Sequence, residues 1–118
     1  MSHTILIVED HPDTREGLAQ LLQLAGYSVA TADDGQQGLV KACALPPDLI
    51  LTDISMPVMD GIEMIKQLRA TAFCKSTPIV VLSAYGDKAL EAARAGANEV
   101  LSKPANLTAM LQVIKSLV

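Results

Sequence analysis

The chain has 118 residues, of which 50% are hydrophobic and 3% aromatic, and its formal net charge is −4. This length fits one domain, spanning residues 1–118, with a core built from aliphatic side chains. The negative charge and the dispersed basic residues argue against direct nucleic-acid binding, which needs clustered lysines and arginines. No apolar stretch approaches the roughly 20 residues of a membrane span, so we expect no membrane contact. The early first strand leaves no room for a signal peptide, so we expect a cytoplasmic protein with Cys43 and Cys74 reduced.

The predicted elements alternate between strands and helices along the chain. Four apolar runs, at residues 5–8, 49–52, 79–82 and 100–102, predict strands that are covered on both faces, as in a parallel sheet. Residues 28–32 are a candidate for a further, shorter strand.

Helices are predicted between and after these strands, from apolar residues spaced three and four apart. They run from Pro12 to a stop at Gly26, over Gln36–Leu45, from Asp60-Gly61 through Leu68-Arg69, over about Asp87–Ala95, and from Leu107 to the end. The alternation predicts an α/β fold: a doubly wound parallel sheet with helices on both faces.

Acidic side chains directly follow two of the apolar runs. Glu9 and Asp10 follow the first run, and Asp53 follows the second. Because the carboxyl ends of parallel strands share one edge of a sheet, we expect these three carboxylates to lie close together. Carboxylates held close repel each other unless a cation or a proton neutralises them. Oxygen ligands without nearby Cys or regularly spaced His favour Mg²⁺, so the pattern predicts a magnesium site.

Ser83 and Lys103 follow the last two apolar runs, so the same argument brings them to this edge. Lys103 alone would be a solvated charge, but beside the acids we expect it to pair with Asp53 and with an anion mounted there. Ser83 is either a helix-capping residue or a hydroxyl that donates to a phosphoryl oxygen. Its place after a buried run favours the second interpretation.

Taken together, these residues resemble the receiver domain of two-component response regulators over the whole length of the chain. The motifs that carry the resemblance are Glu9-Asp10, Asp53, Met56-Pro57, Asp60-Gly61, Ser83-Ala84, Ala95-Gly96-Ala97 and Lys103-Pro104. Each motif is weak alone, and their order between the predicted strands makes the set specific. The resemblance implies a flavodoxin-like, five-stranded sheet with the strand order 2-1-3-4-5.

The resemblance also implies a chemistry for the acidic residues. Asp53 would accept a phosphoryl group from the phosphohistidine of a sensor histidine kinase or a phosphotransfer protein. Asp10, Asp53 and the backbone carbonyl of Ser55 would bind Mg²⁺, and Glu9 would act through water. The chain would be a signalling switch rather than an enzyme, and its phosphorylated form would bind a downstream protein differently.

Further roles are implied for the loops. Ser83, Ala84 and Lys103 would hold the phosphoryl group. Ser55 and Tyr85 are at positions that resemble those tuning phosphate lifetime in the family, and an ordinary role as loop residues is equally open for both. The residues expected to shape the loops are Met56, Pro57, Gly61 and Pro104.

Some residues depart from the family pattern. Val100 stands where similar receivers carry Tyr or Phe, Ala105 replaces a frequent Phe, and the segment 83–97 is about two residues shorter. These departures keep open a degenerate receiver that acts as a phosphate-independent interaction module. A dehalogenase-type phosphatase or a flavodoxin fits less well, because residues 9–11 lack a D-x-D pattern and no Gly-rich phosphate loop follows. The final helix and the fourth-helix region offer apolar residues for a partner, and we expect a monomer or a weak homodimer.

Overall fold

The computed structural model describes residues 3–84, 86–103 and 106–118. Five parallel strands form one sheet in the order β2-β1-β3-β4-β5, so the predicted α/β fold and strand order are confirmed. The strands are β1 Thr4–Val8, β2 Ser28–Ala32, β3 Leu49–Asp53, β4 Ile79–Ser83 and β5 Glu99–Ser102. The helices are α1 Pro12–Leu24, α2 Gly35–Ala44, α3 Gly61–Arg69, α4 Gly86–Ala95 and α5 Leu107–Leu117. The second and fourth helices each begin one residue before the predicted start.

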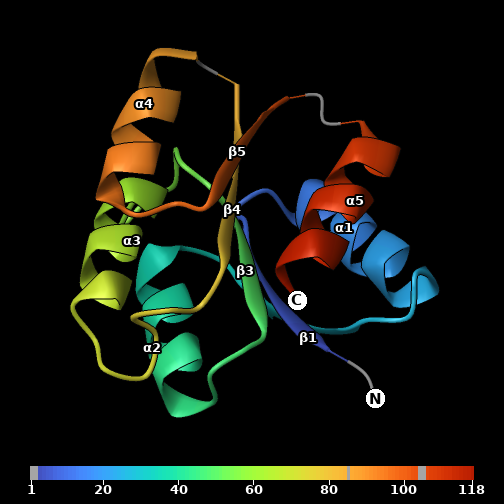
Figure 1. The fold of residues 1–118 in the computed structure, drawn as a ribbon, viewed down its shortest axis with the longest axis horizontal. Coiled ribbons are helices and arrows are strands. Elements are labelled where there is room, and N and C mark those ends of the chain that lie inside the picture. Colours follow the sequence, from blue (N-terminus) through green and yellow to red (C-terminus); the bar gives the residue numbers. More distant parts are fainter. Residues whose placement is uncertain (1–2, 85, 104–105) are drawn as a thin grey trace.

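The sheet separates two helical layers, α1 and α5 on one face and α2, α3 and α4 on the other (Figure 1). Successive side chains of a strand point to opposite faces, so each strand supplies both cores. In β1, Ile5 and Ile7 pack under α1 and α5, whereas Leu6 and Val8 pack under the other layer. Each of these fully buried aliphatic side chains contributes roughly 1.5–3 kcal/mol to stability.

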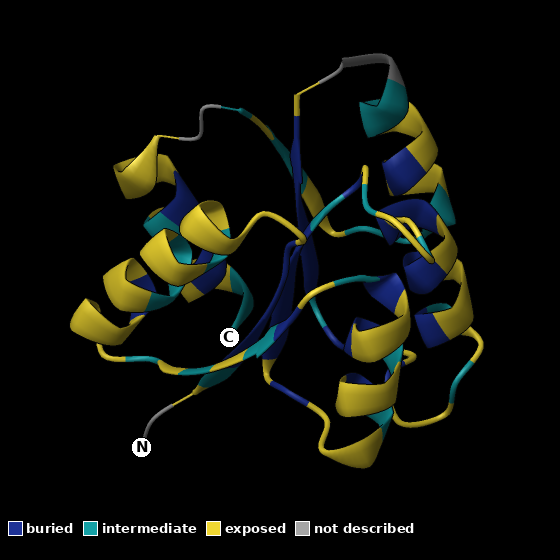
Figure 2. Cartoon of the chain, turned by 180° about the vertical axis from the view of Figure 1, so that it is seen from behind, coloured by how far each residue is buried: buried dark blue, intermediate teal, exposed yellow. Residues whose placement is uncertain are grey.

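The three central strands are the most deeply buried part of the chain (Figure 2). Both of their faces are covered by helices, which is why their sequences are continuous apolar runs rather than alternating ones. The edge strands β2 and β5 expose part of their length, and their sequences are correspondingly more mixed. None of the helices in the described part of the chain is both long and apolar enough to span a membrane.

Polar side chains start α2, α3 and α5, and glycines follow α1 and α4. Asp34, Asp60 and Asn106 each accept a hydrogen bond from a backbone N–H in the first turn of α2, α3 and α5, which satisfies a donor that the helix leaves free. Gly26 follows α1 with a φ of 101°, and Gly96 follows α4 with a φ of 125°, a backbone region that glycine adopts readily.

A single arginine joins three segments at the amino edge of the sheet. The Arg69 guanidinium, at the end of α3, donates to the backbone carbonyls of Cys74, Lys75, Thr77 and Gly96 over 2.7–3.2 Å. It also donates to Asn98 Oδ1 at 2.9 Å, and that side chain in turn accepts from the amide of Ile79. Arg69 therefore ties the end of α3 to the segments that lead into β4 and β5.

Candidate functional site

Three carboxylates meet at the carboxyl edge of the sheet. Glu9 follows β1 and is 4% exposed, Asp10 is the next residue, and Asp53 ends the neighbouring strand β3. One carboxylate oxygen from each residue lies within 4.8 Å of the other two. Because Val8 and Thr52 are paired in the register of β1 and β3, the residues that follow them emerge side by side. All donors here are hard oxygen atoms, the ligand type that Mg²⁺ prefers.

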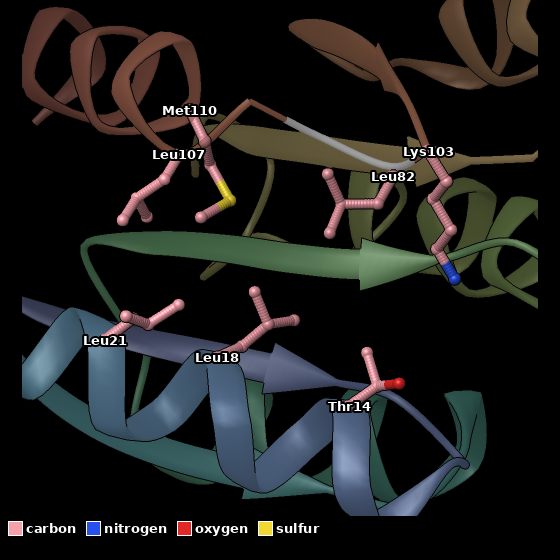
Figure 3. Close-up of a pocket in the computed structure, with 7 residues that line it drawn as sticks. All are labelled: Thr14, Leu18, Leu21, Leu82, Lys103, Leu107 and Met110. Atoms are coloured by element: carbon pink, nitrogen blue, oxygen red, sulfur yellow. The ribbon is translucent and has the colours of Figure 1, made fainter.

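Lys103 brings a positive charge to these acids from the end of β5. Its backbone amide donates to the carbonyl of Ser83 at 2.8 Å, which continues the pairing of β5 with β4. Its ammonium nitrogen lies 3.0 Å from Asp53 Oδ2 and 3.5 Å from Glu9 Oε1. Figure 3 shows this side chain reaching toward the end of β3. The structure thus brings together four charged residues that are scattered over the sequence.

The charges at this edge shift the pKa values of two groups. Burial raises the pKa of Glu9 to about 7, and the neighbouring negative charge of Asp53 adds to this effect. Burial disfavours the charged form of Lys103, but its hydrogen bond to Asp53 and the charges of Asp53 and Glu9 outweigh burial and raise the pKa of Lys103. Lys103 is therefore a cation at neutral pH, and three acids face one base. Such an excess of negative charge attracts a divalent cation.

A cavity of about 190 Å³ opens beside Asp53. Its lining comes from the ends of β3, β4 and β5 and from the first turn of α4: Asp53, Ile54, Ser55, Ser83, Ala84, Lys88 and Lys103. The sequence predicted all of these as site residues except Ile54 and Lys88. The other residues were predicted because they follow the carboxyl ends of strands. Lys88 lies in a helix, so that criterion does not identify it. Its signal is its place five residues after Ser83, in the turn that starts at the same edge.

The loop between β3 and α3 is held close to Asp53 by a glycine. A Cβ atom at Gly61 would lie 2.1 Å from the carbonyl oxygen of Asp53, so no other residue fits without a shift of the backbone. The amide of Gly61 donates to the carbonyl of Ile54 at 2.8 Å, and the amide of Gly35 in α2 donates to the carbonyl of Met59 at 3.0 Å. These contacts fix the loop that carries Ser55.

Two methionines of this loop pack inward. Met56 and Met59 are partly buried against the core under α2, α3 and α4, while Pro57 is exposed.

Val58, in the same loop, has a φ of 70°, which strains a β-branched residue. Val100 packs against the same core as the methionines. The predicted site residues Tyr85 and Pro104 lie outside the described residues.

An apolar groove of about 410 Å³ runs between α1 and α5 and ends at Lys103. In Figure 3, Leu18 and Leu21 of α1 face Leu107 and Met110 of α5 across this groove. Leu21 and Leu107 are 40% and 39% exposed, so the groove presents apolar surface to the outside. The groove thus starts beside the acidic cluster.

Comparison with known proteins identifies the family. The family described as response regulator receiver domain matches residues 5–115. A probable chemotaxis protein CheY of Rhizobium etli is 36% identical over 115 residues, which cover 95% of this chain and 89% of the relative. The transcriptional regulatory protein PrrA of Mycobacterium tuberculosis is 38% identical over 118 residues, which cover 98% of this chain. The chain spans 50% of the length of PrrA and 24% of the length of the regulator DctD of Pseudomonas aeruginosa.

A solved structure agrees with the sequence relatives. The response regulator TrrA from Thermotoga maritima, in complex with Mg²⁺ and BeF, is 33% identical with a TM-score of 0.90, and the match covers 100% of both chains. Sequence and fold therefore agree over nearly the whole chain. This chain belongs to the response regulator receiver domain family of two-component signalling.

Proposed function

We propose that this receiver domain is a phosphorylation-activated switch and that Asp53 is its phosphoryl acceptor. The observation that carries the proposal is the setting of the Asp53 carboxylate. It lies beside two other carboxylates and 3.0 Å from the Lys103 ammonium, at the wall of a cavity of about 190 Å³. The donor would be the phosphohistidine of a sensor histidine kinase or a phosphotransfer protein, as in related receivers.

The transfer needs little covalent work from the protein. A carboxylate oxygen of Asp53 attacks the phosphorus atom, and an O–P bond forms as the N–P bond of phosphohistidine breaks. The electron pair stays on the imidazole nitrogen, which then takes up a proton. A carboxylate nucleophile releases no proton when it attacks, so the transfer needs no general base, and the Lys103 ammonium lies 3.0 Å from Asp53 Oδ2, beside the attacking group.

Glu9, Asp10 and Asp53 supply the oxygen donors that suit Mg²⁺, and the relative TrrA binds Mg²⁺ with BeF. We assign Asp10, Asp53 and the backbone carbonyl of Ser55 as direct ligands and Glu9 as a ligand through water. Bound Mg²⁺ supplies neutralisation of charge on the transferred phosphoryl oxygens. Since the pKa of Glu9 is about 7, we expect the affinity for Mg²⁺ to rise with pH through the neutral range.

The phosphoryl group would act on the opposite wall of the cavity. Ser83 and Ala84, at the end of β4, line this wall, and α4 begins two residues later. The hydroxyl of Ser83 would donate to a phosphoryl oxygen, and the new negative charge would shift a two-state equilibrium of this segment. In this scheme the domain changes its own conformation and converts no other substrate, so it is a signalling domain rather than an enzyme.

We place the protein in the cytoplasm. Cys43 and Cys74 are both free, which fits a reducing compartment.

The donor protein must place its histidine next to Asp53, so it needs a contact surface beside the site. The groove between α1 and α5 ends at Lys103 and exposes Leu21 and Leu107. We propose this groove as the contact surface for the donor protein.

Intact mass measurement tests the proposed function. Incubation with acetyl phosphate and Mg²⁺ should add one phosphoryl group to the protein, and Asp53→Asn should take up none. Hydroxylamine, which cleaves acyl phosphates, should remove the added mass. A wild-type protein that stays unmodified would reject the proposal and favour a phosphate-independent interaction module.

A further inference from the structure

The cavity beside Asp53 has a second lysine in its wall. Lys88, from the first turn of α4, lines the cavity together with Asp53, Ser83 and Lys103. Lys88 is half-buried, and among the described side chains no carboxylate forms an ion pair with its ammonium. Lys103, by contrast, is paired with two carboxylates. Among the described side chains, Lys88 is thus the lysine of this cavity that has no carboxylate partner, so its ammonium is available to an anion.

The position of Lys88 in its helix is unfavourable for a lysine. The first turn of a helix carries partial positive charge, so acidic residues stabilise it and basic residues destabilise it by about 0.3–1 kcal/mol. Arg15 also lies near the amino end of its helix, α1, but it forms an ion pair with Asp33 at 3.3 Å. The last turns of α2, α3 and α5 carry basic residues, whose charge is favourable there. At Lys88 the helix end and the ammonium add their positive potential on the same side of the cavity. An anion in the cavity offsets this local cost.

The charge balance of the phosphorylated site leaves room for such a cation. The three acids carry up to three negative charges, which Mg²⁺ and Lys103 together match. A phosphoryl group on Asp53 carries close to two negative charges in place of one. The site is then one positive charge short, and Lys88 lies in the wall of the cavity that the phosphoryl group would enter.

We propose that Lys88 is a second phosphoryl-binding cation, which donates to an oxygen of the phosphoryl group on Asp53. The inference rests on the proposed function of Asp53. It joins the start of α4 directly to the phosphorylated residue by a charge-assisted hydrogen bond. Val100 stands where similar receivers carry an aromatic residue. The contact with Lys88 would let the phosphoryl group change the position of α4 without such an aromatic side chain.

Titration with beryllofluoride at saturating Mg²⁺, followed by calorimetry, tests the inference, since beryllofluoride stands in for a phosphoryl group. In Lys88→Met the affinity for beryllofluoride should fall about tenfold, because a charged hydrogen bond is lost. The loss should shrink as salt is added, and Lys88→Arg should recover most of it. Lys115→Met removes the same charge from an exposed position in the last turn of α5 and should change the affinity less than about twofold.

The affinity for Mg²⁺ alone separates binding from folding. Removal of a positive charge cannot weaken a cation site electrostatically, so Lys88→Met should bind Mg²⁺ at least as tightly as the wild type. A Lys88→Met protein that loses both affinities would overturn the inference, because Lys88 would then support the structure of the site. Wild-type affinity for beryllofluoride in Lys88→Met would overturn it as well. If the wild type itself fails to bind beryllofluoride, the proposed function of Asp53 fails instead.

Discussion

The two edges of the sheet each depend on a cation, and the partners of the two cations differ. At the amino edge, Arg69 donates to four backbone carbonyls and one side-chain amide, all of them neutral. At the carboxyl edge, Lys103 faces Asp53 and Glu9 beside a cavity, with Asp10 nearby. Neutral acceptors satisfy the hydrogen-bond donors of the guanidinium and add no net negative charge that would attract another cation. Three acids around one ammonium leave negative charge over, and that excess gives the carboxyl edge its capacity to bind.

The comparison predicts that the amino edge governs stability, and Arg69→Met should have the largest effect. Loss of the guanidinium leaves several carbonyls without donors, so the free energy of unfolding should fall by about 2–4 kcal/mol. Urea unfolding measures this change, and Arg94→Met, at an exposed position in the last turn of α4, should cost less than about 0.5 kcal/mol. The affinity of folded Arg69→Met for Mg²⁺ should match the wild type. A small loss of stability with weakened Mg²⁺ binding would break the comparison.

The opposite pattern is expected for Asp10→Asn at the carboxyl edge. The affinity for Mg²⁺ should fall at least about tenfold, because a proposed direct ligand is lost. Stability without metal should stay the same or rise, since one of three clustered negative charges is removed. Calorimetric titration with Mg²⁺ gives the first result and urea unfolding the second. Glu99→Gln, an exposed acid at the amino edge, is the matched control and should leave Mg²⁺ binding unchanged.

The raised pKa of Glu9 predicts a pH dependence that Mg²⁺ should remove. The pKa is about 7 in the folded protein against an ordinary value of 4.5, so between these pH values the folded protein holds more protons than the unfolded chain. The free energy of unfolding should therefore fall as pH rises from 4.5 to 7, by on the order of 2 kcal/mol without metal. Mg²⁺ favours the ionised carboxylate and should restore stability most at pH 8.

Glu9→Gln isolates this effect from other groups that titrate in the same range. Urea unfolding from pH 5 to pH 8 with a chelator should show a flatter profile for Glu9→Gln than for the wild type. If the free energy of unfolding changes equally with pH in the two proteins, ionised Glu9 does not destabilise the carboxyl edge. That result would contradict the contrast between the two edges.

The smallest expected effect concerns backbone strain beside the acids. Val58 has a φ of 70° and its side chain is 82% exposed, so the residue gains little from packing. Val58→Gly should raise the free energy of unfolding by up to about 1 kcal/mol, since glycine adopts this conformation without strain. Val58→Ala keeps a Cβ atom and should gain less. Thermal unfolding measures both variants, and a less stable Val58→Gly would show that this loop carries no strain.

The sequence allowed prediction of the parts of the molecule that depend on side-chain pattern. The buried strands are continuous apolar runs, and the parallel arrangement then brings Glu9, Asp53 and Lys103 to one edge. This inference needed only the positions of the strand ends. The first and last residues of α2 were each wrong by one residue, because apolar periodicity does not fix a helix end to a single residue.

Other features were beyond sequence reasoning because they depend on backbone atoms or on tertiary distance. The acceptors of Arg69 are mainly carbonyls, which every residue carries, so no residue type marks them. The need for glycine at position 61 follows from an approach to the carbonyl of Asp53 that only the folded chain has. Lysine is common at exposed helix positions, so the place of Lys88 five residues after Ser83 is a weak signal, and the cavity lining is what identifies the residue.

The loop between β3 and α3 is tied at both ends, by Gly61 to Ile54 and by Met59 to Gly35. These hydrogen bonds restrain one side of the cavity, so we expect the opposite side, which Ala84 and Lys88 line, to move when an anion binds. Millisecond exchange seen by nuclear magnetic resonance should therefore be one-sided, silent between Ile54 and Gly61 and concentrated at the start of α4. Phosphorylation would then move the start of α4 while the loop between β3 and α3 stays in place, and a downstream protein would recognise the new position of α4.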